Sequence, residues 1–194
     1  MSDRYATYHE GRGPLKALCL ALVLCLWAAA GFGGERDVRR AWVGLELFPT
    51  LLAADMDITA RQDASGALPV LLLYRDDPAT ALDMADRLRR IDRVRGLSLR
   101  IETAGLDSLD NLGALSPAGV FLTQSAGDDL ERVAAFCRER GILLFSPFEG
   151  DVENGAAAGI RVSDRIQPYV NLEAVRASGL RLKPFFLQVA VVYE

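Results

Sequence analysis

Side chains that could recognise a ligand gather in four short polar segments, each of which follows an apolar run. These segments are Arg75-Asp76-Asp77, Thr103-Ala104-Gly105, Thr123-Gln124-Ser125 and Ser146-Pro147-Phe148-Glu149. They supply a cation, hydroxyls and an amide, which bind a ligand through hydrogen bonds rather than transform it. The sequence therefore predicts a binding site and no catalytic residues. Eight residues are the candidates: Arg75, Asp76, Thr123, Gln124, Ser125, Ser146, Phe148 and Glu149.

Two sets of acidic residues could have a further role. Asp76 and Asp77 could act as a general acid and base, but Asp77 precedes a proline and fits the N-cap of a helix, the interpretation we favour. Glu149, Asp151 and Glu153 could hold a hard cation such as calcium. Calcium-binding loops need a longer oxygen-rich spacing, so we interpret these three as solvated loop acids and predict no metal site.

The N-terminal segment has the layout of a secretory signal peptide. A basic lead that includes Arg12 and Lys16 runs into an apolar block over residues 17–30, and small residues follow. Fourteen residues rise only about 21 Å as a helix, less than the roughly 30 Å of a bilayer core. We therefore predict a signal peptide over residues 1–34, cleaved between Gly31 and Glu35, and a periplasmic mature protein. An uncleaved anchor is the alternative.

Removal of this segment restricts the chemistry of the mature chain. His9 is the single histidine, and of the three cysteines only Cys137 lies outside the segment. Without histidine there is no Ser-His-Asp or Cys-His nucleophile and no imidazole metal ligand. Cys137 falls on the apolar stripe of a predicted helix and is expected in the core, not as a reactive thiol. The sequence predicts neither an enzyme nor a cofactor.

Residues 35–194 are predicted to form a single α/β domain, because about 160 residues suffice for one core. Apolar strand-like runs alternate with amphipathic helical segments from residue 68 onward. The predicted strands cover residues 68–74, 97–101, 119–122 and 142–145, and the predicted helices start near residues 77, 106 and 128. This alternation predicts a three-layer fold with a mostly parallel sheet flanked by helices.

The two ends of this domain depart from the alternation. Residues 38–54 predict a helix interrupted at Pro49. Residues 159–162 and 166–170 flank a polar turn and predict a C-terminal β-hairpin. Its second strand contains Pro168, so we expect that strand at an edge or with its nitrogen side toward solvent.

Two helices are predicted after the hairpin. Asn171 is a good N-cap for a short helix that reaches Ser178. Pro184 then begins an apolar closing helix that reaches Val192 and is expected to lie mostly in the core.

The predicted topology brings the polar segments together. Ligands of open parallel sheets bind outside the carboxyl ends of the strands, where the four segments fall. We therefore expect the candidate residues to form one rim.

Charge restricts the partners. The formal net charge of −4 argues against nucleic acid as a partner. Five arginines near the end of the helix that starts at residue 77 could dock on an acidic partner or on lipid headgroups. We interpret them as cations that offset the helix dipole. They are Arg87, Arg89, Arg90, Arg93 and Arg95.

The C-terminal part of the sequence resembles the YfiR/HmsC-like periplasmic proteins. A hairpin from Gly159 is followed by spaced residues typical of that family: Asn171, Ala174, Ser178-Gly179-Leu180, Leu182, Phe186-Leu187, Ala190 and Val192. The resemblance implies a small exported α/β protein without enzymatic activity that binds and restrains a membrane diguanylate cyclase in cyclic di-GMP signalling. The sequence departs from the family pattern in two respects. Only Cys137 remains for a redox role, and a tryptophan-proline pair before the first strand is absent.

The sequence thus favours a non-enzymatic regulator that contacts a membrane signalling enzyme. Such a regulator is expected to have an exposed apolar or arginine-bearing patch and could form a homodimer. The main alternative is a periplasmic small-molecule-binding protein, associated with a transporter, which requires a deep pocket at the strand ends. A hydrolase that uses carboxylates alone would need two acids facing one cleft.

Overall fold

The computed structural model describes residues 13–112 and 115–194, with side chains from residue 34 onward. The chain divides into two units, Met1–Arg36 and Asp37–Glu194, and helix α1 (Gly13–Ala54) contributes to both. Residues 1–12 and the side chains of residues 13–33 lie outside the description, so the signal peptide over residues 1–34 and its cleavage stay predictions. Within the described residues, no helix has both the length and the apolar character needed to cross a bilayer.

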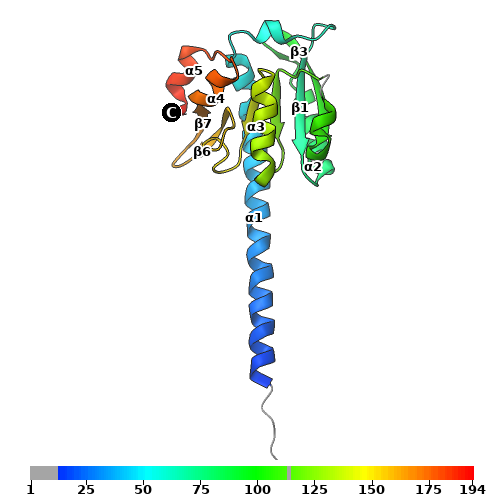
Figure 1. Cartoon of the computed structure of the whole chain (residues 1–194), viewed down its shortest axis with the longest axis vertical. Coiled ribbons are helices and arrows are strands. Elements are labelled where there is room, and N and C mark those ends of the chain that lie inside the picture. Colours follow the sequence, from blue (N-terminus) through cyan, green and yellow to red (C-terminus); the bar gives the residue numbers. More distant parts are fainter. Residues whose placement is uncertain (1–12, 113–114) are drawn as a thin grey trace, which may run out of the picture. The chain divides into compact units, whose positions relative to one another are not determined.

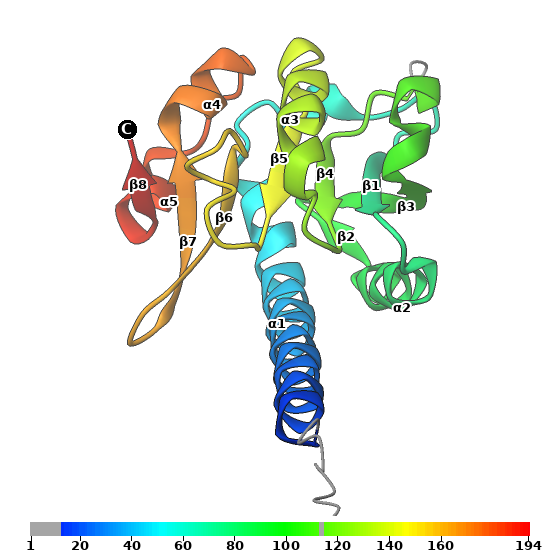
Figure 2. The ribbon, with the colours of Figure 1, turned by 60° about the horizontal axis from the view of Figure 1, so that its bottom comes forward.

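The second unit contains an eight-stranded sheet in the order β2-β3-β1-β4-β5-β6-β7-β8 (Figures 1 and 2). Its strands are β1 (Leu68–Tyr74), β2 (Arg93–Val94), β3 (Leu97–Gly105), β4 (Gly119–Leu122), β5 (Leu143–Ser146), β6 (Ala158–Val162), β7 (Ile166–Asn171) and β8 (Val191–Tyr193). Neighbouring strands are parallel except in the β2–β3 and β6–β7 pairs. The predicted α/β class with a mostly parallel sheet and a C-terminal hairpin is confirmed.

Helices cover both faces of this sheet. They are the second-unit part of α1, α2 (Pro78–Arg89), α3 (Leu130–Glu139), α4 (Leu172–Ala177) and α5 (Pro184–Val189), with 3-10 turns η1 (Ile58–Arg61), η2 (Leu106–Leu112) and η3 (Gly127–Asp129). The β1-α2-β3 and β4-α3-β5 connections run in opposite directions along the sheet, so right-handed crossovers place α2 and α3 on opposite faces. Arg87 of α2 pairs with Glu46 of α1 at 2.9 Å, which puts these helices on one face.

Helix α2 shows how local sequence sets an element boundary. The Asp77 carboxylate accepts a hydrogen bond from the Thr80 backbone N–H at 2.9 Å, and Pro78 occupies the first turn. The Thr80 hydroxyl also donates to this carboxylate, and these bonds lower the pKa of Asp77. The helix-cap interpretation of Asp77 is therefore confirmed. The inward face of α2 is buried and consists of Ala81, Met84, Ala85 and Leu88.

The core centres on three aromatic rings that join α1 to the sheet. The Phe48 ring of α1 lies 5.4 Å from Phe121 on β4 and 5.6 Å from Phe145 on β5, centroid to centroid. All three side chains are buried. Gly119 lies directly beneath, where a Cβ atom would be 2.8 Å from Leu52 and 3.0 Å from Phe48. The absence of a side chain at this position lets the helix approach the sheet.

The predicted interruption of α1 at Pro49 is wrong, because the helix continues to Ala54. A proline removes one backbone donor and crowds the carbonyl four residues earlier. On both sides of Pro49 the helix buries large side chains against the sheet, among them Phe48, Leu51 and Leu52, each at most 2% exposed. Tertiary packing therefore maintains the helix.

The predicted closing helix is wrong in its extent. Helix α5 ends at Val189, and the chain continues as strand β8, which pairs in parallel with β7. The free side of β7 offers backbone groups that a strand can satisfy, and consecutive valines favour a strand. The helix is also not mostly core: Phe186 is buried, but Phe185 is 67% exposed and Val189 is 53% exposed.

Pro168 fits its strand without breaking a ladder. Asn171 donates its N–H to the Ala157 carbonyl on the β6 side. Because residues alternate along an antiparallel pair, Pro168 directs its nitrogen away from β6, as predicted. The strand is not an edge throughout, since β8 pairs with it from Tyr169 onward.

Two further boundaries differ from the prediction. Strand β3 continues to Gly105, so Thr103, Ala104 and Gly105 belong to a strand and not to a loop. The short strand β2 was not predicted, and it takes Arg93 out of the predicted helix-end cluster.

Replacing Phe48 by alanine is expected to destabilise the protein by about 3–5 kcal/mol, because a buried ring at the helix–sheet contact is lost. Urea unfolding followed by circular dichroism measures this change. Val38→Ala is the matched control on the same helix, since Val38 is 43% exposed. Equal effects of the two substitutions would contradict the central place of Phe48 in the core.

Candidate functional site

The carboxyl edge of the parallel strands brings five of the eight candidate residues together. Strand β1 lies between β3 and β4, so the chain direction reverses between β1 and β4, and ligands of parallel sheets bind at such a reversal. The loops that follow β1 and β4 meet at this point. The five residues are Arg75, Asp76, Thr123, Gln124 and Ser125.

The crevice between these two loops is filled by the side chain of Gln124. Its Oε1 accepts hydrogen bonds from the backbone N–H groups of Arg75, Asp76 and Asp77 at 2.9, 3.0 and 2.9 Å. Its Nε2 donates to the Asp76 carboxylate at 2.5 Å. Three successive N–H groups that converge on one oxygen form a cradle that suits an anion. In this protein the amide oxygen of Gln124 occupies that cradle.

The neighbouring polar groups also bond within the protein. The Arg75 guanidinium donates to the Ala126 carbonyl oxygen and lies against Gly127, where a Cβ atom would be 2.7 Å from Arg75 Nη2. Gly127 has a φ of +52°, which also favours glycine. The buried Thr123 hydroxyl donates to the Leu73 carbonyl at 3.0 Å. Ser125 Oγ accepts a hydrogen bond from the Gly127 N–H at 3.3 Å. These groups therefore fasten the two loops to each other.

The remaining three candidates lie at the end of β5 and in the loop that follows it, away from the crevice. Ser146 is buried, donates to the Asp151 carboxylate at 2.5 Å and accepts a hydrogen bond from the Phe148 N–H at 3.3 Å. Burial raises the pKa of Asp151, and the Ser146 hydrogen bond partly offsets this rise. Phe148 is 5% exposed, whereas Glu149 is exposed.

Phe148 and Glu149 line a groove beside the β6–β7 hairpin. Strand β6 overlaps β5 only at Phe145 and Ser146 and then continues to Val162, so the hairpin projects past the carboxyl edge (Figure 2). We name this cavity of about 190 Å³ the hairpin groove. It is lined by Arg40, Phe148, Glu149, Gly150, Glu153, Ile160, Arg161, Val162 and Tyr169.

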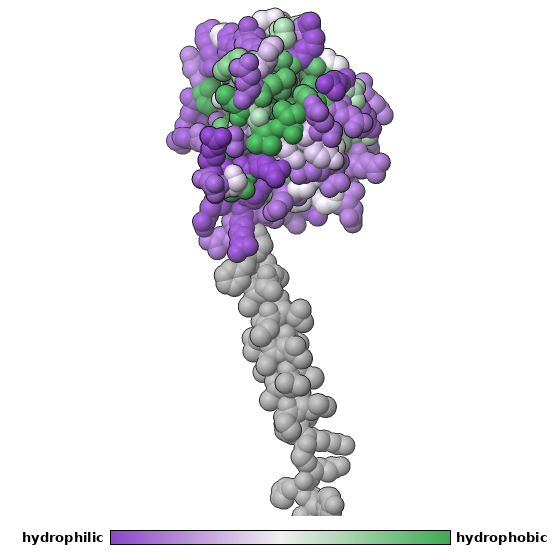
Figure 3. All heavy atoms as spheres, turned by 90° about the vertical axis from the view of Figure 1, so that its left-hand side faces the viewer, coloured by the Kyte–Doolittle hydropathy of each residue, from purple (hydrophilic) through white to green (hydrophobic). Residues whose placement is uncertain are grey.

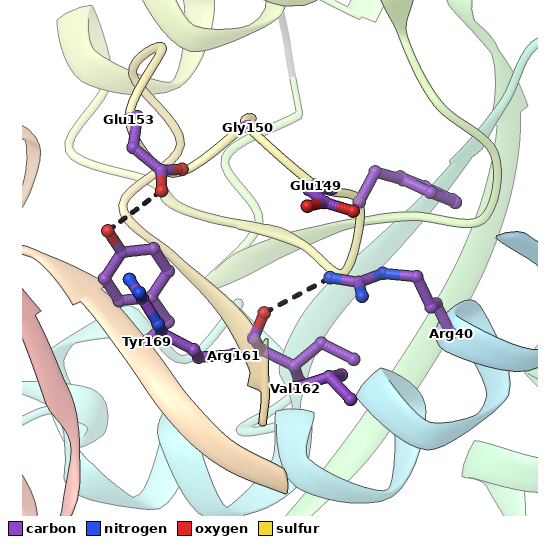
Figure 4. A pocket seen from close by; sticks show the side chains of 9 residues that line it. Arg40, Glu149, Gly150, Glu153, Arg161, Val162 and Tyr169 are labelled. Atoms are coloured by element: carbon purple, nitrogen blue, oxygen red, sulfur yellow. Dashed lines mark hydrogen bonds between the residues drawn. The ribbon is translucent and has the colours of Figure 1, made fainter. Parts of the chain in front are cut away.

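Some charged side chains of the hairpin groove form hydrogen bonds within the protein, and others do not (Figure 4). Arg40 donates to the Pro147 carbonyl at 2.9 Å and to the Ile160 carbonyl at 3.4 Å, which ties α1 to the groove. The Tyr169 hydroxyl donates to Glu153 at 2.9 Å. The Arg161 guanidinium lies 5.3 Å from the centre of the Tyr169 ring. Glu149 forms no ion pair or hydrogen bond with another described residue, so its carboxylate is available to a partner.

Of the nine groove residues, only Phe148 and Glu149 were candidates in the sequence analysis. Three of those that it missed carry a polar or charged group into the groove: Arg40, Arg161 and Tyr169. The predicted hairpin could have identified Arg161 and Tyr169, because pairing of its two strands places Tyr169 opposite Gly159, close to Arg161. Arg40 could not be found in this way, since its place depends on how α1 packs against the sheet.

The acidic loop residues do not converge. Asp151 points to Ser146, and Glu153 points to Tyr169. In the described part of the chain, no group of three or more His, Cys, Asp or Glu side chains is arranged to hold a metal ion.

Cys137 is buried in α3, as expected from its place on the apolar stripe. Burial raises the pKa of its thiol to about 12, so the reactive thiolate form is disfavoured.

A second and wider opening lies beside α3. Its volume is about 520 Å³, and its polar lining includes Asp128, Glu131, Arg138, Asp151 and Asn154. This opening has the size of a small-molecule site.

The comparison with known protein families decides the kind of protein. The family model described as YfiR/HmsC-like matches residues 58–191. The chain belongs to the YfiR/HmsC-like family. Membership supports a periplasmic regulatory role, in agreement with the resemblance in the C-terminal sequence. No curated protein matches the sequence.

Solved structures share the fold at low identity. A conserved domain protein from Vibrio cholerae matches with a TM-score of 0.51 and 13% identity over 70% of this chain and 57% of its own. An ABC domain in complex with L-Trp from Streptococcus pneumoniae matches with a TM-score of 0.56 and 10% identity, over 79% of this chain and 60% of its own. The substrate-binding protein CD0873 from Clostridium difficile matches with a TM-score of 0.52 and 15% identity, over 78% of this chain and 58% of its own. This chain thus spans about three fifths of the length of each.

Replacing Gln124 by alanine is expected to destabilise the protein by about 1 kcal/mol, because three backbone donors lose their shared acceptor. Hydrogen exchange at Arg75, Asp76 and Asp77 should become faster. Gln188→Ala is the control, because Gln188 is exposed and remote in the fold. Unchanged exchange at the three amides would show that Gln124 does not hold the crevice closed.

The stability of the protein is expected to depend on pH through Asp151. Burial, with the nearby charges of Asp37 and Glu153, raises its folded-state pKa above the ordinary 3.8, although Arg40 opposes this. The folded state therefore holds this proton more tightly than the unfolded state, and the free energy of unfolding falls as pH rises from the ordinary pKa through the raised one.

Asp151→Asn removes this dependence. The stability of the variant relative to the wild type should be higher at pH 7 than at pH 3. At pH 3 the wild-type carboxyl is protonated in the folded and in the unfolded state, so its burial costs no charge. Thermal unfolding at the two pH values measures the difference, with Asp164→Asn in the exposed turn as control. A difference that does not change with pH would contradict the buried-carboxyl assignment.

Proposed function

We propose that this protein is an exported, non-enzymatic regulator that binds a membrane signalling enzyme, a diguanylate cyclase, through its periplasmic part. Membership in the YfiR/HmsC-like family supports the regulatory class. The predicted signal peptide supports export. Binding would favour an inactive arrangement of the cyclase, and an envelope signal would release it by favouring a non-binding state.

The observation that carries this proposal is the hairpin groove with its projecting tip. Near the tip, Val162 is 51% exposed and Ile166 is 48% exposed, and the charges of Arg161 and Glu149 lie beside them. Exposed apolar side chains flanked by arginine and tyrosine are typical of protein interfaces. The groove, at about 190 Å³, is smaller than the roughly 300–1,000 Å³ of pockets for drug-sized ligands. A protein surface is therefore the favoured occupant.

The contrast with the crevice supports the same conclusion. A parallel α/β sheet would bind a small ligand between the loops after β1 and β4. Gln124 and Arg75 already use the polar groups there. A ligand in that position would have to break these hydrogen bonds first.

Photocrosslinking in cells of the source tests the proposal. A photoreactive amino acid at position 162 should capture the membrane cyclase, whereas the same group at position 92 should not. Asp92 is exposed next to β2, at the opposite edge of the sheet. Capture from both positions, or from neither, would contradict docking at the hairpin.

A loss-of-contact variant gives the second arm of this test. Val162→Asp combined with Ile166→Asp should abolish co-purification of the cyclase and raise cellular cyclic di-GMP, because charges would be buried in an apolar contact. Asp164→Asn in the turn between them should leave both unchanged. A folded double variant that still restrains the cyclase normally would contradict the proposal.

A second candidate function is small-molecule binding, in association with a transporter. The opening of about 520 Å³ beside α3 favours it, as does the shared fold with a substrate-binding protein. Amino acids added to the exported protein should then raise its Tm, and Arg138→Ala should remove the increase. No increase with any amino acid would contradict an amino-acid site in this opening.

A further inference from the structure

Two surfaces outside the hairpin groove differ in the chemistry that they offer. One lies over α4 and α5, where apolar side chains gather (Figure 3), and Phe185 of α5 is 67% exposed. Residues 184–193 contain no charged side chain, so that surface does not identify its occupant. The other is the opening of about 520 Å³ beside α3, which we name the α3 opening. Its lining has charged groups of both signs, and these restrict the ligand that can bind.

Small and apolar residues form the floor of the α3 opening. Ala134 belongs to α3, and a Cβ atom at Gly155 would lie 3.5 Å from the Ala134 Cβ. The helix and the turn that contains Gly155 therefore meet without a large side chain between them. Leu130, which is 7% exposed, adds an apolar wall. An apolar floor with a few polar groups around it suits a small organic ligand.

The charged residues of the α3 opening lie at two ends. Helix α3 connects the parallel strands β4 and β5, so it starts at the carboxyl edge of the sheet and ends at the amino edge. Asp128 and Glu131 lie at its start, and Asp151 lies at the same edge, since it is bonded to Ser146 at the end of β5. Arg138 lies in the last turn. The helix start carries about half a positive charge, so the three acids leave that end negative.

Most of these charges are not used within the protein. Asp128, Glu131 and Arg138 form no ion pair or side-chain hydrogen bond with another described residue. Arg132 of the same helix does not line the opening, and it pairs with Asp129 at 3.0 Å. The charges that face the opening are therefore available to a ligand.

The spacing of the free charges sets the length of that ligand. Glu131 and Arg138 are seven residues apart on one face of α3, so their Cα atoms are about 10 Å apart. Helical side chains lean toward the N-terminus, so both lean the same way and the spacing is kept. Three residues of extended peptide span about 10 Å. The ammonium and carboxylate of a single amino acid share one carbon atom, so an amino acid reaches only one end.

A side-chain amide lies between the two ends. Asn154 precedes Gly155, which packs beside Ala134, midway between Glu131 and Arg138. The Asn154 Nδ2 donates to the Gly150 carbonyl at 2.9 Å, which leaves its Oδ1 as an acceptor. The N–H of a peptide group is a donor that suits this position.

We propose that the α3 opening binds a peptide of about three residues with free termini. Its ammonium group pairs with Asp128 and Glu131, its carboxylate pairs with Arg138, and a peptide N–H between them donates to Asn154. The inference rests on the second candidate function and narrows its ligand from amino acids to short peptides. It does not require a cyclase at the hairpin.

Isothermal titration calorimetry of the protein without residues 1–34 tests the proposal, with trialanine as the probe. Trialanine should bind more tightly than alanine, and more tightly than trialanine with both termini blocked. Glu131→Gln and Arg138→Gln should each weaken trialanine binding about fivefold, as expected for the loss of one exposed ion pair. No binding of trialanine, or equal affinities for alanine and trialanine, would overturn the proposal.

Helix α4 supplies matched controls. Glu173 and Arg176 are exposed and occupy its first and last turns, as Glu131 and Arg138 do in α3. Glu173→Gln and Arg176→Gln should therefore leave trialanine binding unchanged. Equal weakening by all four substitutions would show an effect of overall charge instead of contact in the opening, and would contradict the proposal.

A peptide blocked at one end tests the direction in which it lies. N-acetyl-trialanine has no ammonium group, so Glu131→Gln should not weaken its binding further, whereas Arg138→Gln should. The opposite pattern would contradict the proposed orientation.

The test separates this inference from docking at the hairpin. Glu131→Gln and Arg138→Gln lie outside the hairpin groove, so crosslinking of the cyclase from position 162 should persist in both variants. Crosslinking without any binding of trialanine would remove the peptide site alone. Binding of trialanine without crosslinking would contradict the regulator and leave the peptide site in place.

Discussion

The packing of α1 against strands β4 and β5 is the contact on which the rest of the structure depends. The Phe48 ring packs at a tilt against Phe121 and Phe145, and Gly119 gives the helix room to approach. The family match begins at residue 58, yet this helix precedes it and fills the centre of the core. The same helix presents Arg40 to the Pro147 and Ile160 carbonyls, so it also positions one wall of the hairpin groove.

The carboxyl edge of the sheet separates the crevice from the hairpin groove, the surface proposed for contact with another protein. Where related architectures bind ligands, Gln124 and Arg75 satisfy the backbone groups of the two loops internally. The free charges and exposed apolar side chains lie farther along the edge, at the hairpin. The Tyr169 ring of the hairpin groove also packs edge-on against Tyr193 of β8, with centroids 6.5 Å apart. The crevice residues therefore have a structural role, and the hairpin is the surface that we propose for partner binding.

The sequence predicted those features that depend on local patterns. The strands β1 and β4, the Asp77 and Asn171 caps, and the hairpin follow from apolar runs, capping residues and a polar turn. The helix through Pro49 and the strand β8 could not be predicted, because both result from tertiary contacts that outweigh local preference. The sequence analysis expected all eight candidates to form one rim, whereas the structure brings five of them together at the crevice. Their mutual hydrogen bonds depend on the distance between two loops, which local patterns do not reveal. The sequence analysis identified only Phe148 and Glu149 of the hairpin groove. Arg40 could not be predicted there, since it lies more than a hundred residues from the loop that it contacts.

Hydrogen exchange of the protein without residues 1–34, with and without the purified membrane enzyme proposed as its partner, is the most direct test of docking at the hairpin. Docking at the hairpin predicts slower exchange in the hairpin and in the loop at residues 148–153 when the enzyme is added. Exchange at residues 75–77 and 123–127 should stay the same, because Gln124 already holds those loops. Slower exchange confined to the two crevice loops, with unchanged exchange in the hairpin, would contradict docking at the hairpin.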